Sequence, residues 1–176
     1  MSIRSHQLPQ HFQRGYTLIE LMVVIAIMGL LTSVVLPYLP GDKQELLNDE
    51  LDRFASRIAY AQTHAVLQSQ DLGLVVVEGE YRFLQRAQAG WKVMDEEPLQ
   101  AQKVPEFLQQ QLFVENQEYI QEDPVDEEVP SPKVLFFSSG EITPFSYRMS
   151  LSEQNYSSLE YDPLGEVKRE SVNESE

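Results

Sequence analysis

The feature that most constrains this chain is an apolar run close to its N-terminus. The segment from Tyr16 to Leu36 contains one charged residue, Glu20, and residues 21–31 contain no charged or polar side chain. A helix of about 20 apolar residues is long enough to span the hydrocarbon core of a bilayer. We therefore expect residues 16–36 to form a transmembrane helix that carries the rest of the chain.

The residues before this helix do not have the order of an ordinary secretory signal. Residues 1–15 contain Arg4 and Arg14 and no acidic residue, and the small residue Gly15 precedes the apolar run. A secretory signal has its small-residue cleavage site after the apolar stretch. Cleavage after Gly15 would remove a leader and keep the helix. On spacing alone, a plain anchor with a basic cytoplasmic tail is an equally good interpretation.

The stretch GYTLIELMVVI, residues 15–25, resembles the class III signal of type IV pilins and type II secretion pseudopilins. That signal has a glycine, an aromatic residue or methionine, three mostly apolar or hydroxylated residues, a glutamate and an apolar helix. Tyr16 stands where phenylalanine is usual. The resemblance implies that a prepilin peptidase cleaves between Gly15 and Tyr16, that the new amino terminus at Tyr16 is methylated, and that Pro37 bends the helix.

Glu20 is costly in a transmembrane helix, which indicates a function. A carboxylate placed toward a membrane interior costs about 2.5 to 3.5 kcal/mol even on lenient insertion scales. Cleavage would create an ammonium group at Tyr16, and the helical rise over the four residue steps from Tyr16 to Glu20 is about 6 Å. The ammonium of one subunit could therefore meet the carboxylate of a neighbour staggered by one turn. We expect this pairing to set register during assembly, as buried polar residues do in coiled coils.

Residues 37–70 are predicted to continue the N-terminal helix after the break at Pro37. Apolar residues recur there at three- and four-residue steps, which indicates an amphipathic helix. Asp42 is a plausible N-cap, with Glu45 as its capping-box partner. The predicted core-facing stripe comprises Leu47, Leu51, Phe54, Ile58, Ala61 and Ala65.

From Leu72 the pattern changes to short β-rich runs separated by turns, which is typical of hairpins. Together with the resemblance to pilins and pseudopilins, this pattern implies an α+β, pilin-like fold in which a long N-terminal helix packs on antiparallel β-sheets. Residues 71–167 would form a periplasmic β-rich domain, and residues 168–176 a flexible tail. The predicted strands are residues 72–77, 81–86, 91–94, 111–115, 133–137, 142–149 and 155–160.

Residues 115–132 form a long acidic stretch with three prolines. The ordered spacing of a calcium-binding loop is absent, and no glycine is present to supply its sharp turn. We interpret the stretch as a solvated loop whose acids could steer a basic partner surface.

Charge and composition exclude several functions. The formal net charge is -15, and removal of Arg4 and Arg14 with the leader makes it -17, so nucleic-acid binding is disfavoured. The absence of cysteine excludes disulfides and thiolate sites. His64 has no ligand partner at suitable spacing, and Ser139 has no catalytic constellation around it. We therefore expect no enzyme activity, no catalytic residue, no cofactor and no metal site.

The C-terminal half resembles the globular domain of H-type minor pseudopilins of type II secretion, which belong to the type IV pilin-like superfamily. The similarity lies in Tyr81-Arg82-Phe83, Trp91 and the run FFSSGEITPF at residues 136–145. It implies a structural subunit near the tip of the pseudopilus that helps initiate assembly and export folded proteins across the outer membrane.

The same resemblance implies partners and a location. The partners would be other minor pseudopilins, the major pseudopilin, the prepilin peptidase and the inner-membrane secretion platform. The protein would sit first in the bacterial inner membrane, with one span and its C-terminal domain in the periplasm, and then in the periplasmic pseudopilus. A minor type IV pilin that primes a surface fibre is the alternative. A DNA-uptake pilin is a weaker one, because it would need a basic surface.

Overall fold

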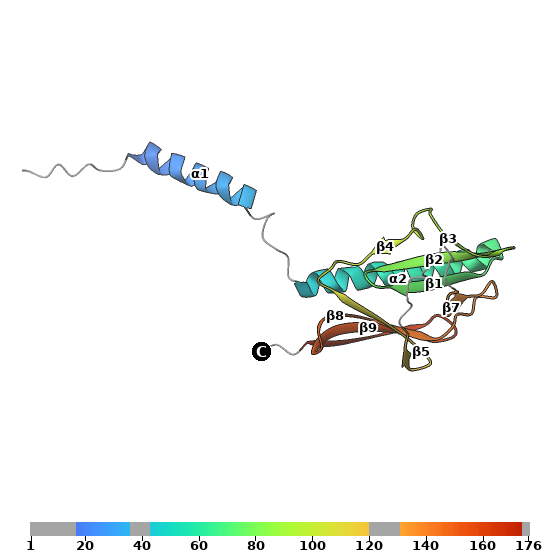
Figure 1. Cartoon of the computed structure of the whole chain (residues 1–176). Helices are drawn as coiled ribbons and strands as arrows, with labels where there is room; N and C mark the ends of the chain where they lie inside the picture. The colour runs from blue at the N-terminus through green and yellow to red at the C-terminus, as the bar shows by residue number, and fades with distance from the viewer. Residues whose placement is uncertain (1–16, 36–42, 120–130, 174–176) are drawn as a thin grey trace, which may run out of the picture. The chain divides into compact units, whose positions relative to one another are not determined.

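The computed structural model describes residues 17–35, 43–119 and 131–173 (Figure 1). The chain separates into two units, Met1–Pro40 and Gly41–Glu176. Helix α1, Leu18–Val35, belongs to the first unit, and all other described elements belong to the second. Residues 36–42, which include the predicted bend at Pro37, lie outside the described residues.

The second unit is an α+β domain in which one long helix is followed by short strands. Helix α2 spans Lys43–Gln68. The first strands are β1 Leu72–Val77, β2 Glu80–Ala87, β3 Gly90–Val93, β4 Gln102–Lys103 and β5 Gln109–Val114. The remaining strands are β6 Gln117–Glu118, β7 Val134–Phe136, β8 Phe145–Ser152, β9 Asn155–Tyr161 and β10 Val167–Asn173.

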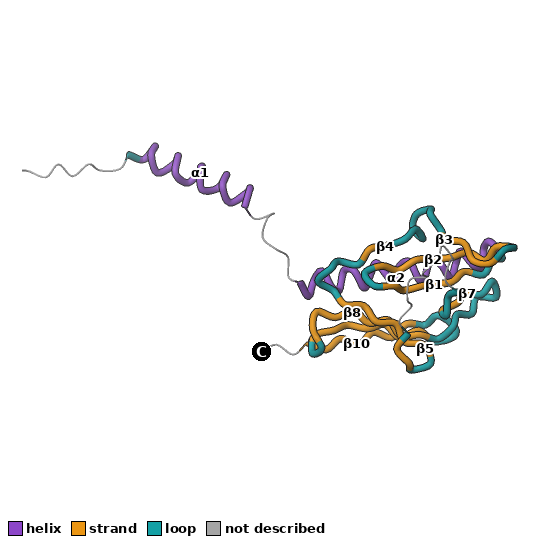
Figure 2. Tube along the Cα trace, viewed as in Figure 1, coloured by secondary structure: helices purple, strands orange, loops and turns teal. Residues whose placement is uncertain are grey.

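The strands form two antiparallel sheets (Figure 2). The first sheet has the order β3-β2-β1-β7, with β4 also paired to β2. The second has the order β10-β9-β8-β5-β6. Strand β7 pairs with β1, so that Leu72 lies opposite Phe136, and the chain then returns to the second sheet at β8.

Helix α2 packs against strands of both sheets, and its buried face is the predicted stripe. Leu47, Leu51 and Phe54 are fully buried, and Ile58, Ala61 and Ala65 are at most 1% exposed. Phe54 stacks on Tyr147 of β8 at 3.9 Å between ring centroids and meets Tyr81 of β2 edge-on at 5.0 Å. One side chain of α2 therefore contacts both sheets.

Polar groups at the edge of this core are paired. Arg57 of α2 donates hydrogen bonds to Tyr81 Oη at 2.9 Å and to Gln102 Oε1 at 2.8 Å, which attaches β4 to the helix. Glu50, absent from the predicted stripe, is also buried and forms an ion pair with Arg53 at 3.2 Å. Burial raises the pKa of Tyr81 to about 12, although the nearby Arg57 charge opposes the rise.

Strand β1 is buried along its whole length, which indicates cover on both faces of the first sheet. Val75, Val77 and Leu84 form a second apolar cluster, with Trp91 and Val93 packed against it. Gly73 is required on this strand because a Cβ there would lie 2.2 Å from Cγ of Pro132.

Two parts of the structure correct the sequence prediction. The expected flexible tail, residues 168–176, is wrong for its first part, because Val167–Asn173 forms β10 and pairs with β9. The acidic stretch 115–132 is not all loop, because residues 117–118 form the exposed strand β6. It is not solvated throughout either, because Pro132 is buried. Its residues 120–130 lie outside the described residues. The charged residues in both segments favoured an exposed, irregular chain in the sequence prediction. Strand pairing and the Pro132 contact involve residues far away in the sequence, so the local pattern could not predict them.

The two buried tyrosines Tyr147 and Tyr161 should respond differently to loss of the hydroxyl. Burial raises the pKa of both side chains, so both are protonated at neutral pH. Tyr147 Oη donates to Gln110 Oε1 at 2.8 Å, whereas Tyr161 Oη has no partner among the residues that the structure describes. Tyr147→Phe should lower the free energy of unfolding by about 1–3 kcal/mol, and Tyr161→Phe should leave it unchanged or raise it.

Urea unfolding of the full chain in detergent micelles at pH 7 measures this difference, with each variant compared with the unsubstituted protein. Equal destabilisation by both substitutions would contradict the hydrogen-bond assignment.

Gly73→Ala should destabilise the domain because the new methyl group would overlap Pro132. Overpacking of this kind costs about 1–3 kcal/mol. Ser139→Ala, in the exposed turn after β7, is the control and should change stability by no more than about 0.5 kcal/mol. Thermal unfolding followed by circular dichroism measures both, and equal unfolding midpoints for the two variants would refute the close packing of Pro132 on Gly73.

Candidate assembly site on the first helix

Helix α1 begins with a capped first turn. Thr17 precedes the helix, and the amide of Glu20 donates to Thr17 O at 3.0 Å and to Thr17 Oγ1 at 3.3 Å. A threonine three residues before a glutamate has the spacing of a capping box. We did not predict this cap, although the T-x-x-E spacing in the sequence could have revealed it.

Glu20 therefore occupies the first turn of α1, where a negative charge is favourable. The unpaired amides at a helix N-terminus carry a partial positive charge that stabilises a carboxylate. Glu20 is the acidic residue of this turn, and the last turn of α1 contains no basic residue. The charge of α1 is thus concentrated at its N-terminal end.

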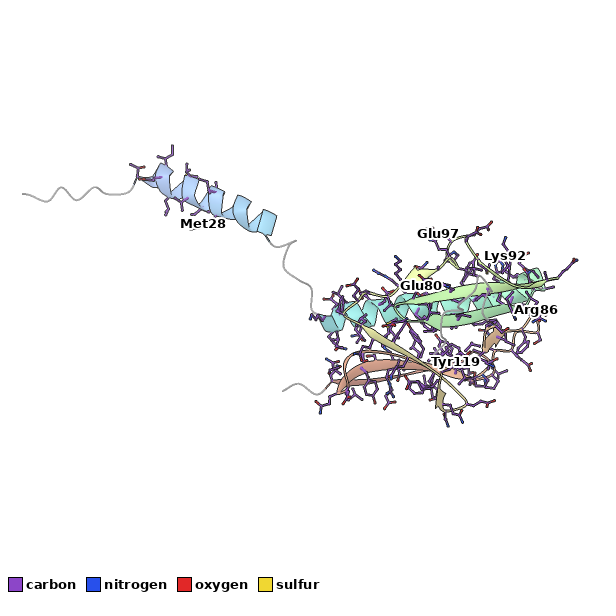
Figure 3. All side chains as sticks on the ribbon, in the orientation of Figure 1. Met28, Glu80, Arg86, Lys92, Glu97 and Tyr119 are labelled. Atoms are coloured by element: carbon purple, nitrogen blue, oxygen red, sulfur yellow. The ribbon has the colours of Figure 1, made fainter. Side chains whose placement is uncertain are left out.

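The rest of α1 is apolar on every side that the structure describes. Its large apolar side chains between Leu18 and Met28 are exposed by 41% to 76%, and Met28 is labelled in Figure 3. A helix that is apolar all round is normally buried, either in lipid or among other helices. The exposed members are Leu18, Ile19, Leu21, Met22, Val23, Val24, Ile25, Ile27 and Met28.

The structure describes only one of the residues predicted to act in processing, assembly and bending of the N-terminal helix. Glu20 lies in α1, whereas Gly15, Tyr16 and Pro37 are outside the described residues. Among the residues that the structure describes, no helix is both long enough and apolar enough to cross a membrane.

Other candidate sites in the sequence do not gain chemical partners in the structure. Across the described segments of the chain, no group of three or more histidine, aspartate or glutamate side chains is arranged to hold a metal ion. The His64 ring lies 5.9 Å from the ring of Tyr60 on the same helix. Ser139 lies in the exposed turn after β7.

Comparison with known proteins agrees with this division into an N-terminal helix and a β-rich domain. Residues 11–36 match the family model of the prokaryotic N-terminal methylation motif. Residues 50–165 match the family model described as type II transport protein GspH.

Curated relatives give the same result over most of the chain. Type II secretion system protein H of Aeromonas hydrophila is 25% identical over 156 residues, which cover 83% of this chain and 85% of the relative. The protein of the same name from Pseudomonas aeruginosa is 29% identical over 145 residues, or 78% of this chain and 83% of the relative.

Solved structures share the fold. The crystal structure of the minor pseudopilin EpsH from Vibrio cholerae superposes with a TM-score of 0.60 at 23% identity and covers 77% of this chain and all of that one. The solution structure of Escherichia coli GspH gives a TM-score of 0.53 at 19% identity, over 69% and 84% of the two chains. The molecule therefore has the fold of a pilin-like subunit.

Within that class the family is defined by the match over residues 50–165. The chain belongs to the GspH family of type II transport proteins. The predicted family and fold class are both confirmed.

Proposed function

We propose that this chain is a minor pseudopilin that acts near the tip of a type II secretion pseudopilus, helping to initiate its assembly and the export of folded proteins across the outer membrane. The match of residues 50–165 to the GspH family is the observation that carries this proposal. The role is structural rather than enzymatic: subunit contacts, not a reaction, are what α1 and the domain provide. Other minor pseudopilins and the major pseudopilin are the proposed partners, together with the inner-membrane platform.

The N-terminal helix has two successive roles in this proposal. It first holds the protein in the inner membrane as a single span from Tyr16 to Leu36, with the C-terminal domain in the periplasm. A prepilin peptidase cleaves after Gly15, and Tyr16 becomes the methylated amino terminus. The match of residues 11–36 to the N-terminal methylation motif supports this step. The helix then leaves lipid and packs among neighbouring helices, which would cover the apolar side chains that are exposed on α1.

Glu20 is the proposed register element of assembly. Its carboxylate would pair with the ammonium group of a neighbouring subunit, and each charge would be far less costly in the apolar filament core when paired than when alone. A 33-residue match to type II secretion system core protein G of Klebsiella michiganensis, at 61% identity, is consistent with a segment shared between subunit types. Such a segment would allow both to enter one filament.

Mass spectrometry of the N-terminus of the protein purified from membranes tests the processing step. The expected product begins at Tyr16 and is heavier by one methyl group. A chain that still begins at Met1 in cells with an active prepilin peptidase would contradict the proposal.

Glu20→Leu should keep the protein in the membrane fraction but reduce its co-purification with other pseudopilins by about tenfold or more, because breaking a buried ion pair leaves an unpaired charge. Glu45→Leu is the matched control, since Glu45 is the acidic residue in the first turn of α2. Immunoprecipitation from membranes solubilised in mild detergent measures both. Normal recovery of partners with the Glu20 variant would remove the register role.

A further inference from the structure

A groove of about 430 Å³ lies on the outer face of the second sheet, away from α2. Alternate residues of β8 show which face this is: Phe145, Tyr147 and Met149 are buried in the core, so Ser146 and Arg148 point to the opposite side. Strands β5, β8, β9 and β10 all contribute to the groove. Nothing in the proposed assembly role of α1 uses this surface.

Arg148 lines the groove, and two aromatic rings pack against its guanidinium. Its guanidinium carbon lies 4.2 Å from the ring centroid of Tyr156 and 5.3 Å from that of Phe113. Both distances are within the range of cation–π attraction. These contacts fix the guanidinium plane in the free protein, so less conformational entropy would be lost when it binds a ligand.

The guanidinium of Arg148 is held in place but its donors are not used. Within the described residues it has no hydrogen-bond or ion-pair partner, and its Nε is buried without an acceptor. Two other arginines near the core do have polar partners. Arg57 bonds Tyr81 and Gln102 through its terminal nitrogens, although its Nε is also buried without an acceptor, and Arg169 bonds Asp52 and Asn48. The two terminal nitrogens of Arg148 therefore have no acceptor among the described residues, and these are the donors that an acceptor on a partner would use.

The surroundings of Arg148 favour one singly charged carboxylate. Lys168 adds a second positive charge at the groove, and the hydroxyls of Ser146 and Ser158 can donate hydrogen bonds. Glu160 and Glu170 also line it and would repel a polyanion or a phosphate dianion. The net charge of -15 opposes nucleic acid further. A guanidinium matches the geometry of a carboxylate through two parallel hydrogen bonds.

We propose that this groove is a docking site for an acidic segment of a partner protein, with one aspartate or glutamate carboxylate bound by the guanidinium of Arg148. The proposal does not rest on the pseudopilus assignment. It requires only a folded second sheet and a partner that presents a carboxylate on an exposed segment.

The test uses the full chain in detergent micelles and a fluorescently labelled peptide of glycine and serine with two spaced glutamates. Arg148→Gln should weaken the binding of this peptide by about tenfold or more, as expected for loss of a charge-assisted bidentate contact. Arg86→Gln is the matched control, because Arg86 stacks on Trp91 at 5.1 Å but belongs to β2 of the first sheet (Figure 3). The control should bind as the unsubstituted protein does.

A peptide with glutamine in place of both glutamates should not bind, and higher salt should weaken the glutamate peptide. Unchanged affinity with Arg148→Gln, or equal binding of the glutamine peptide, would overturn the proposal. Inorganic phosphate provides another test: binding of phosphate without binding of the peptide would also overturn it.

Folding of the Arg148 variant must be established separately, because the same side chain packs on two rings. If that variant unfolds, NMR of the unsubstituted protein decides the question. Saturable shifts of the amide resonances of Ser146 and Ser158 on peptide addition would support the site. Their absence, with shifts confined to other surfaces, would refute it.

Discussion

Contact of Phe54 with both sheets is the interaction on which the domain depends. Within the described part of the chain, no strand pairing joins the two sheets, so side-chain contacts hold them together. Most of these surround α2, and the amide of Gln110 on β5 also donates directly to the carbonyls of Val77 and Glu80 in the first sheet. Phe54 contacts Tyr81 of the first sheet and Tyr147 of the second, while the apolar stripe of α2 covers the space between them. Each tyrosine also carries a polar hydroxyl group that needs a partner: Tyr81 Oη accepts a hydrogen bond from Arg57, and Tyr147 Oη donates one to Gln110. This polar edge restricts how the sheets can dock, because a shifted arrangement would leave buried groups unpaired.

The two helices differ in how their apolar surfaces can be buried, and this difference connects the fold to the proposed function. Helix α2 is amphipathic, so its own domain can bury its stripe. Helix α1 is apolar on all described sides and carries Glu20 at its capped first turn. Packing against one face of a folded domain cannot cover such a helix on every side. Lipid or neighbouring helices must do so, which is the requirement that membrane storage followed by filament assembly would meet.

Local patterns predicted those elements whose stabilising partners are near in sequence. The three- and four-residue spacing from Leu47 to Ala65 predicted the buried face of α2, and the short β-rich runs separated by turns after Leu72 predicted the β1-β2-β3 meander. Elements that depend on distant partners were missed. The charged segment at Val167–Asn173 becomes a strand because β9 offers it a free edge. Glu50 is also buried on this face of α2, and a pattern of apolar residues could not have predicted that position for a glutamate.

The sequence by itself determined the apolar N-terminal run, the position of Glu20 within it and the acidic balance of the chain, because these are properties of composition and local spacing. The tertiary structure alone decided that β7 joins β1 and that β5 pairs with β8. It also decided that Phe113, Arg148 and Tyr156 meet on one face of the second sheet. Strand register is set by packing between residues far apart in the chain. A short stretch of sequence therefore cannot predict which side chains become neighbours across the sheet.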